Sequence, residues 1–234
     1  MIAMVFLIVL ACVVPASFLL KPAIKKAPGA WYALAALLVL LYLAGVQGVL
    51  PTWARGIVFL LMQKGALAAA LFVVVMFIGV FPRDSKTRLY MAPIRAELSI
   101  FAGILICGHM LAYSVSYVPR LVASTITDPY VLAGLVVAAL LVGLVAVLDV
   151  TSLSHVKTHM STRTWKKVQK GAYVFYGLIY IHVLAMLLPS AMNGGSAAVQ
   201  SIAVYTAVFV VYAVARVTRA VMDKKRKQAA VPVG

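Results

Sequence analysis

Acidic residues are scarce in this sequence, and charged residues are few overall. Five Asp and Glu residues stand against 21 Lys and Arg residues, and only 11% of the 234 residues are charged. Water-soluble domains carry about 25% charged residues, so this composition excludes an ordinary soluble enzyme. The chain is instead 65% hydrophobic with a mean hydropathy of +1.06, which is typical of a protein embedded in a bilayer.

Cysteine is also rare. The chain has two cysteines, Cys12 and Cys107, and both lie in apolar runs. They predict neither a disulfide framework nor the Cys-x-x-Cys-His attachment site of c-type haem. The sequence has no Gly-x-Gly-x-x-Gly motif and no phosphate-binding loop. The chain is therefore not expected to bind a nicotinamide or flavin nucleotide with a soluble domain of its own.

Long apolar runs occupy most of the chain. There are seven, at residues 2–20, 30–50, 57–81, 97–118, 130–150, 171–189 and 199–221. A helix needs roughly 20 residues to cross hydrocarbon about 30 Å thick, and a helix satisfies its own backbone polar groups there. We therefore predict an all-α fold, a polytopic transmembrane helical bundle of about seven helices that forms a single domain over residues 1–234.

The basic residues gather between alternate apolar runs. Eighteen of the 21 fall on one side of the predicted membrane: Lys21, Lys25, Lys26, Arg83, Lys86, Arg88, Arg95, Lys157, Arg163, Lys166, Lys167, Lys170, Arg216, Arg219, Lys224, Lys225, Arg226 and Lys227. Basic loops stay in the cytoplasm, so the N-terminus is predicted outside and the C-terminus, with a basic tail over 222–234, cytoplasmic. The clusters indicate topology, with membrane lipid and no nucleic acid as a partner.

Two of the four histidines lie in the middle of apolar runs, His109 in FAGILICGHMLAY and His182 in YGLIYIHVLAM. A polar ring is costly there and marks a functional candidate. His109 follows Arg95 by fourteen residues and His182 follows Lys170 by twelve, about 21 and 18 Å along a helix. The two imidazoles therefore lie at one depth and could bind a planar haem between them. The alternative is that each ring bonds a carbonyl or hydroxyl group of a neighbouring helix.

Several features around these histidines occur in a defined order. A basic loop precedes the first His-bearing helix, a Tyr follows its His, a Thr-Ser pair ends the next helix, and a Trp-Lys-Lys stretch leads to the second His-bearing helix. This order resembles the ferric reductase-like transmembrane domain, and within it the haem-binding membrane subunit of the periplasmic methionine sulfoxide reductase system. The likeness covers about residues 56–190, which leaves 2–20 and 30–50 as additional helices.

The resemblance implies that His109 and His182 bind the iron of one b-type haem. The family usually has a further histidine thirteen residues before the one matching His182, but this chain has Gln169 there, and Ala96 stands thirteen residues before His109. A second haem is therefore not expected. We expect an electron-transfer subunit of an oxidoreductase in the bacterial cytoplasmic (inner) membrane, with no catalytic residues of its own. Its donor would be a quinol or a flavin, with quinone, FMN or FAD as a further cofactor, and a reductase partner would act on the outer face.

Other polar residues are candidates for parts of the same site. Lys64 interrupts an apolar run and could meet a haem propionate or a quinone oxygen, or it could extend to the outer surface. Tyr113 and Arg120 could line an exit route or bind a propionate, although interfacial tyrosines are common. His155 and His159, four residues apart in a basic loop, could bind a metal or a flavin phosphate, with a solvated loop as the alternative.

A membrane transporter or channel is the main alternative function, with the buried histidines relaying protons or a metal ion. The sequence suggests no paired acidic residues inside the spans and no repeated half-structures, features that mark many transporters. A purely structural subunit would leave the two matched histidines unexplained. We therefore expect an electron-transfer protein.

Overall fold

The fold, taken from a computed structural model that describes residues 2–229, is all-helical in that range. Its elements are α1 (Ile2–Leu19), α2 (Lys21–Lys26), α3 (Pro28–Val46), α4 (Thr52–Met62), α5 (Ala66–Ile78), α6 (Lys86–Met91), the 3-10 helix η1 (Ala92–Ile94), α7 (Arg95–Val122), α8 (Pro129–Val150), α9 (Ser154–Thr158), α10 (Thr162–Gln169), α11 (Gly171–Met192) and α12 (Ser196–Ala229). The last residues of the predicted tail, 230–234, lie outside the described residues.

Within the described residues, six helical segments are long and apolar enough to cross a membrane. They are Pro28–Val46, Thr52–Ile78, Lys86–Val122, Pro129–Val150, Thr162–Met192 and Ser196–Arg226, and a shorter apolar helix covers Met4–Leu19. The prediction of a multi-pass, all-helical membrane protein is confirmed. The count of seven spans and the orientation of the termini stay predictions.

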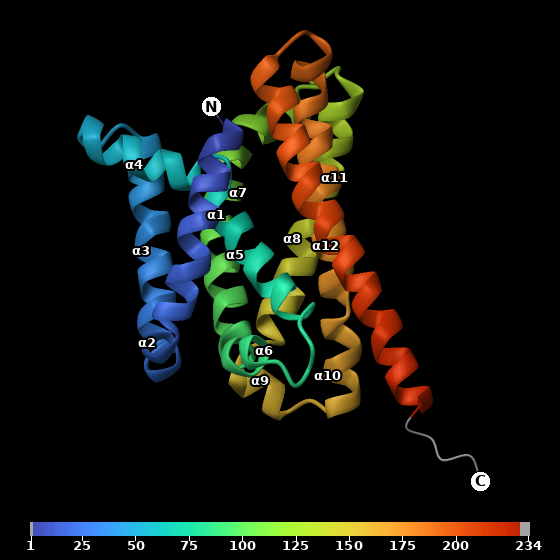
Figure 1. Ribbon diagram of the computed structural model, residues 1–234. Coiled ribbons are helices and arrows are strands. Elements are labelled where there is room, and N and C mark those ends of the chain that lie inside the picture. The colour runs from blue at the N-terminus through green and yellow to red at the C-terminus, as the bar shows by residue number, and fades with distance from the viewer. Residues whose placement is uncertain (1, 230–234) are drawn as a thin grey trace.

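Two groups of helices make up the bundle (Figure 1). In the first group α7 packs against α3 and α5, and α1 packs against α5; in the second, α11 packs against α8 and α12. Helix α5 joins the groups through aromatic side chains. Phe72 lies 5.0 Å from Phe175 of α11 and Phe77 lies 5.5 Å from Tyr212 of α12, measured between ring centroids. Residues 71–76 of α5 are all buried, so this helix forms the centre of the core.

The run expected as one span over 57–81 is divided into α4 and α5. Helix α4 ends at Met62, and Gly65 adopts a left-handed conformation with φ of 64°, which glycine tolerates without the Cβ clash of other residues. In Figure 1 α4 runs across the view whereas α5 runs down it. Gln63 and Lys64, between the two helices, are exposed. The bend therefore keeps these two polar side chains out of the core.

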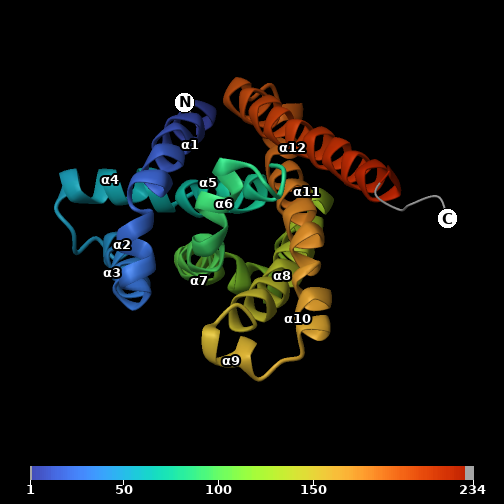
Figure 2. The same cartoon turned by 60° about the horizontal axis from the view of Figure 1, so that its bottom comes forward.

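Asp128 determines where α8 begins. Its carboxylate accepts hydrogen bonds from the backbone N–H groups of Tyr130 and Val131 at 2.8 and 3.2 Å, and Pro129 occupies the first helical position. An acidic N-cap followed by proline is a favourable helix start. At its other end α8 leads through α9 and α10 into α11, as Figure 2 shows.

Candidate functional site

His109 of α7 is held by a backbone carbonyl group from the α4–α5 link. Its Nδ1 atom lies 3.0 Å from the Gln63 carbonyl oxygen. Since a carbonyl oxygen only accepts, Nδ1 carries the proton, and Nε2 of the neutral ring keeps its lone pair. No backbone N–H of the described residues donates to this carbonyl group, because the helix break has removed its helical partner. The break at Gly65 thus supplies the group that orients His109.

His182 of α11 is held in the same way by a different helix. Its Nδ1 atom lies 3.0 Å from the carbonyl oxygen of Gly134 in α8. A Cβ atom at Gly134 would lie 2.7 Å from the Met186 sulfur and 3.4 Å from the Ala185 Cβ. Glycine therefore allows α8 and α11 to approach closely enough for this bond. As with His109, the Nε2 atom is left with its lone pair.

The two histidines share an electrostatic environment. The His182 and Lys64 side chains are both close enough to His109 for a charge on either to act on its ring. The alternative expected from the sequence, a bond from each ring to a neighbouring helix, is therefore realised at Nδ1. It leaves ligation through Nε2 open, because metal-bound histidines commonly donate their other N–H to a carbonyl group.

The donor set fits a haem better than a bare metal ion. Within the described residues, no group of three or more His, Cys, Asp and Glu side chains gathers where it could hold a metal ion. His109 and His182 would give an ion two protein donors. A haem brings four nitrogen donors of its own and leaves two axial positions, which two imidazoles can fill.

Aromatic rings follow His109 along one face of α7 toward the C-terminal end of that helix. The Tyr113 ring centroid lies 4.7 Å from that of His109, and the Tyr117 ring stacks at 6.1 Å from Tyr113. The Arg120 guanidinium lies 5.5 Å from the Tyr117 ring centroid. The spacing of four residues places the three rings on one helix face. Arg120 therefore contacts the end of this row, and Tyr113 is the residue next to the histidine.

A cavity of about 350 Å³ opens beside this row of rings. It is lined by Val46, Arg55, Phe59, Gln63, Ala112, Tyr113, Ser116 and Tyr117. The Arg55 guanidinium lies 5.1 Å from the Phe59 ring centroid. A cation with aromatic walls suits an anionic or aromatic molecule. Sequence reasoning missed Arg55, because an isolated arginine beside an apolar run carries no signal of its own.

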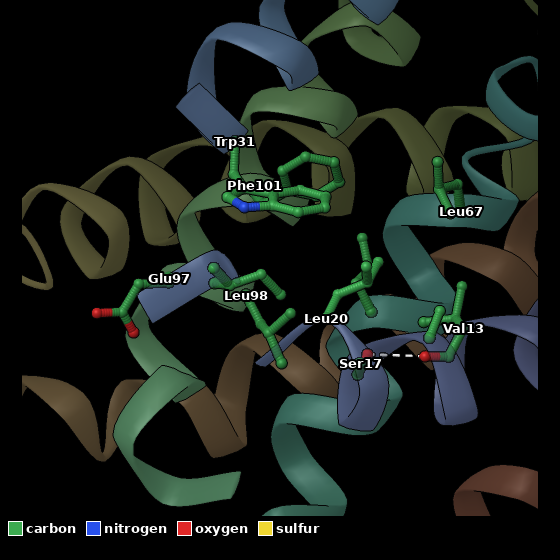
Figure 3. A pocket seen from close by; sticks show the side chains of 11 residues that line it. Val13, Ser17, Leu20, Trp31, Leu67, Glu97, Leu98 and Phe101 are labelled. Carbon is green, nitrogen blue, oxygen red and sulfur yellow. Dashed lines mark hydrogen bonds between the residues drawn. The ribbon is translucent and has the colours of Figure 1, made fainter. Parts of the chain in front are cut away.

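A second cavity, of about 180 Å³, is apolar and lies among α1, α2, α3, α5 and α7 (Figure 3). The Ser17 hydroxyl on its wall donates to the Val13 carbonyl oxygen at 2.7 Å. The carboxylate of Glu97 points away from the other labelled side chains in Figure 3. This cavity therefore offers packing space for an apolar group, and the Oε2 atom of Glu97 on its wall is buried without a hydrogen-bond partner among the described residues.

Gln169, where the family has its inner histidine, is part of a clamp between α8 and α10. Its side-chain amide nitrogen lies 3.3 Å from the Leu148 carbonyl oxygen, 3.1 Å from the Thr151 hydroxyl and 3.2 Å from the Ser152 hydroxyl. The Trp165 indole N–H donates to the Thr151 carbonyl oxygen at 3.0 Å. The Thr-Ser pair and the Trp stretch that carry the resemblance therefore contact one another.

His155 and His159 form a local pair outside the membrane-spanning segments. Their ring centroids lie 4.8 Å apart, and Nδ1 of His159 is 2.7 Å from the His155 carbonyl oxygen. Both residues are exposed on and beside the short helix α9. No third ligand of the described residues joins them, which agrees with a solvated loop.

An acidic side chain makes a polar contact between two of the membrane-spanning helices. Asp149 of α8 accepts a hydrogen bond from the Ser99 hydroxyl of α7 at 3.2 Å. Tyr32 lies near enough to both Glu97 and Asp149 for their charges to act on its hydroxyl group. A Cβ atom at Gly103 would overlap the Asp149 carboxylate, so this glycine lets α8 approach α7. Sequence spacing could not find this contact, because Ser99 and Asp149 lie on different helices.

Comparison with known proteins gives one relative. Over 166 residues the chain is 38% identical to a protein of Treponema pallidum (strain Nichols) that is described as uncharacterized, and the match covers 70% of this chain and 46% of that protein. The chain thus spans about half the length of the curated relative it matches. No protein-family model and no solved structure matches the chain.

Proposed function

We propose that this chain is a membrane b-type cytochrome subunit that transfers electrons from a quinol or flavin donor to an acceptor or partner reductase on the outer face. His109 and His182 would be the two axial ligands of one haem. Bound between them, the haem would supply a one-electron redox centre in an apolar environment. The proposal includes membership of the ferric reductase-like superfamily and a location in the bacterial inner membrane.

One observation carries the proposal. Each imidazole is fixed at Nδ1 by a backbone carbonyl group, from the α4–α5 link for His109 and from α8 for His182, which leaves both Nε2 atoms with lone pairs for a metal. A histidine that served packing alone would need only the one bond to a carbonyl group. It would gain nothing from a second histidine bonded in the same way. The same arrangement on two helices favours a ligand that both rings bind.

The outer cavity and the row of tyrosines support a route toward the outer face. Tyr113 lies next to His109, and both Tyr113 and Tyr117 line the cavity with Arg55. In this proposal Arg55 attracts an anionic acceptor, and the aromatic rings shorten the distance that an electron must cross. Lys64, near His109, would offset the negative charge of a propionate group. Gln169 and Ala96 leave the inner half without ligands, so the donor must reach into the membrane.

The test is an absorption spectrum of the purified full chain, oxidised and then reduced with dithionite. A sharp b-type difference band supports the proposal. A protein purified from haem-sufficient cells that shows no such band, and gains none on addition of hemin, overturns it. Reduction by menaquinol in proteoliposomes would then identify the donor, with reduced FMN as the comparison.

Proton transport is a second candidate function, because two acidic residues, Glu97 of α7 and Asp149 of α8, lie in membrane-spanning helical segments and Asp149 bonds Ser99 between these helices. Buried acids in a membrane are costly and are common in proton pathways. The paired variant Glu97→Gln with Asp149→Asn separates the two candidates. A transporter would lose gradient-driven flux in proteoliposomes, whereas an electron-transfer subunit would keep its haem band and its rate of reduction by menaquinol.

A further inference from the structure

An arginine cluster gathers at the basic end of the bundle, away from the histidines. It consists of Arg83, Arg88, Arg95, Arg216, Arg219 and Arg226, contributed by the α5–α6 link, α6, α7 and α12. Arg95 bonds the Val75 carbonyl oxygen of α5, two residues before Phe77, whose ring lies 5.5 Å from that of Tyr212 on α12. The Arg226–Asp84 ion pair joins α12 to the α5–α6 link. The cluster therefore brings together side chains more than 130 residues apart in the sequence.

Two aspartates neutralise only part of this charge. Asp223 pairs with Arg219, and Asp84 pairs with Arg226 at 3.1 Å. Neither of these ion pairs includes Arg83, Arg88, Arg95 or Arg216. Six guanidinium groups against two carboxylates leave an excess of about four positive charges, and like charges held together are unfavourable unless an anion joins them.

Three of the four arginines outside these ion pairs are held by neutral groups. Arg95 donates to the Val75 carbonyl oxygen at 3.2 Å, and Arg88 donates to the Phe81 carbonyl oxygen at 3.0 Å. Arg216 donates to the Tyr173 hydroxyl at 2.8 and 3.2 Å. These bonds fix the side chains and leave further N–H groups on each guanidinium for another acceptor.

Arg219 gives a second, independent indication of a missing acceptor. The residue is 8% exposed, and its Nε–H is buried without a hydrogen-bond partner among the described residues. A buried N–H group without a partner is costly. An anion with several oxygen atoms would satisfy it together with the neighbouring guanidinium groups, and a phosphate group matches the fork of arginine best.

We propose that this arginine cluster binds the phosphate group of an anionic phospholipid. The cluster lies where the apolar spans of α7 and α12 give way to basic residues, the level of lipid headgroups. The helices that carry it also expose apolar side chains, among them Leu89 on α6, Val174 on α11 and Val217 on α12. Acyl chains would cover these side chains, whereas a free phosphate would not.

The experiment is native mass spectrometry of the full chain in detergent after incubation with equal amounts of phosphatidylglycerol and phosphatidylcholine. The wild type should retain phosphatidylglycerol in preference. The Arg95→Gln and Arg216→Gln double variant should lose that preference by about tenfold for each charge-assisted bond removed. The matched control is the variant Arg163→Gln with Lys166→Gln, which changes two exposed residues of α10. This control has the same net charge as the double variant.

Three outcomes would overturn the proposal. Equal loss in the control would mean that the lipid binds to basic charge in general. An unchanged preference in the double variant would place the lipid elsewhere. Stabilisation by inorganic phosphate or FMN equal to that by phosphatidylglycerol, measured as Tm of lipid-depleted protein, would assign the site to a soluble phosphate. If the double variant does not fold, the single Arg216→Gln variant carries the same comparison, because Arg216 bonds only a tyrosine hydroxyl.

Discussion

The histidine level of α7 and α11 differs sharply from the level thirteen residues nearer the basic end, where Ala96 lies in α7 and Gln169 ends α10. At the first level His109 and His182 each use one ring nitrogen for a carbonyl group and keep the other with a lone pair. At the second level the Gln169 amide nitrogen bonds three oxygen atoms at the end of α8 and just after it, those of Leu148, Thr151 and Ser152, and Ala96 has no polar group. The first level therefore presents donors for a ligand, and the second holds a structural contact.

These two levels show that the role of a polar side chain depends less on its residue type than on whether all of its polar atoms already have protein partners. A polar group whose atoms all have protein partners stabilises the fold. A group that is positioned by one bond and left with a second donor atom is prepared for a ligand. The substitutions below test whether the two levels are separable.

Replacing a histidine should have the largest effect. His109→Ala or His182→Ala should abolish the b-type band or convert it to a five-coordinate spectrum, because one axial donor is lost. His155→Ala, in the exposed loop, is the control and should leave the spectrum unchanged. Haem content like that of the wild type in His182→Ala would show that the histidine level is not a ligand site.

Gly65→Ala should have a smaller effect on the same level. Alanine at φ of 64° costs roughly 1–2 kcal/mol, and its Cβ would lie 3.0 Å from Ile106 Cδ1 and 3.8 Å from the His109 ring. The α4–α5 link should shift, and the Gln63 carbonyl group with it. We expect a lower Tm and a shifted haem band, whereas Gly143→Ala, which has open space around it, should show neither change.

Gln169→Ala tests the structural level. The variant leaves the Thr151 and Ser152 side chains without their amide partner and should cost about 1–3 kcal/mol of stability. Haem content and band position should stay as in the wild type. Gln200→Ala, an exposed glutamine of α12, gives the baseline. Loss of the haem band in Gln169→Ala, with the fold retained, would show that the two levels are coupled.

The number of haems per chain tests whether the level of Gln169 and Ala96 holds a ligand. The pyridine haemochrome assay should give one haem per chain in the wild type, and Gln169→His should not raise this number, because Ala96 offers no second ligand. Two haems per wild-type chain would contradict the assignment of the inner level.

Asp84 should give the smallest effect. Its own backbone hydrogen bond, and after it the hydrogen bond from Arg226, lower the pKa of this exposed carboxyl group. A lowered folded-state pKa stabilises the protein above the ordinary pKa, and the contribution is lost as the pH falls through the lowered value. Asp84→Asn should therefore reduce Tm slightly at pH 7 and not at about pH 2. An equal reduction at both pH values would mean that the charge is not involved.

Several features of the fold and site could be predicted from the sequence. Apolar runs of about 20 residues allow only helices in a bilayer, so the all-helical architecture followed from composition and run length. The spacing of His109 from Arg95 and of His182 from Lys170 predicts equal depth for the two rings, because helix rise is constant, and both residues do lie within helices, α7 and α11. The exposure of His155 and His159 was also predictable, because both lie in a basic loop between two apolar runs.

The tertiary structure decided everything that depends on contacts between helices. An apolar run does not reveal a bend, so the break at Gly65 and the Gln63 carbonyl group that it frees for His109 were not predictable. The Gly134 partner of His182 arises only where α8 meets α11. Likewise the Ser99–Asp149 bond and the arginine cluster join residues far apart in the chain. Hydropathy measures how each segment partitions into the membrane, whereas these polar contacts depend on how the segments pack against one another.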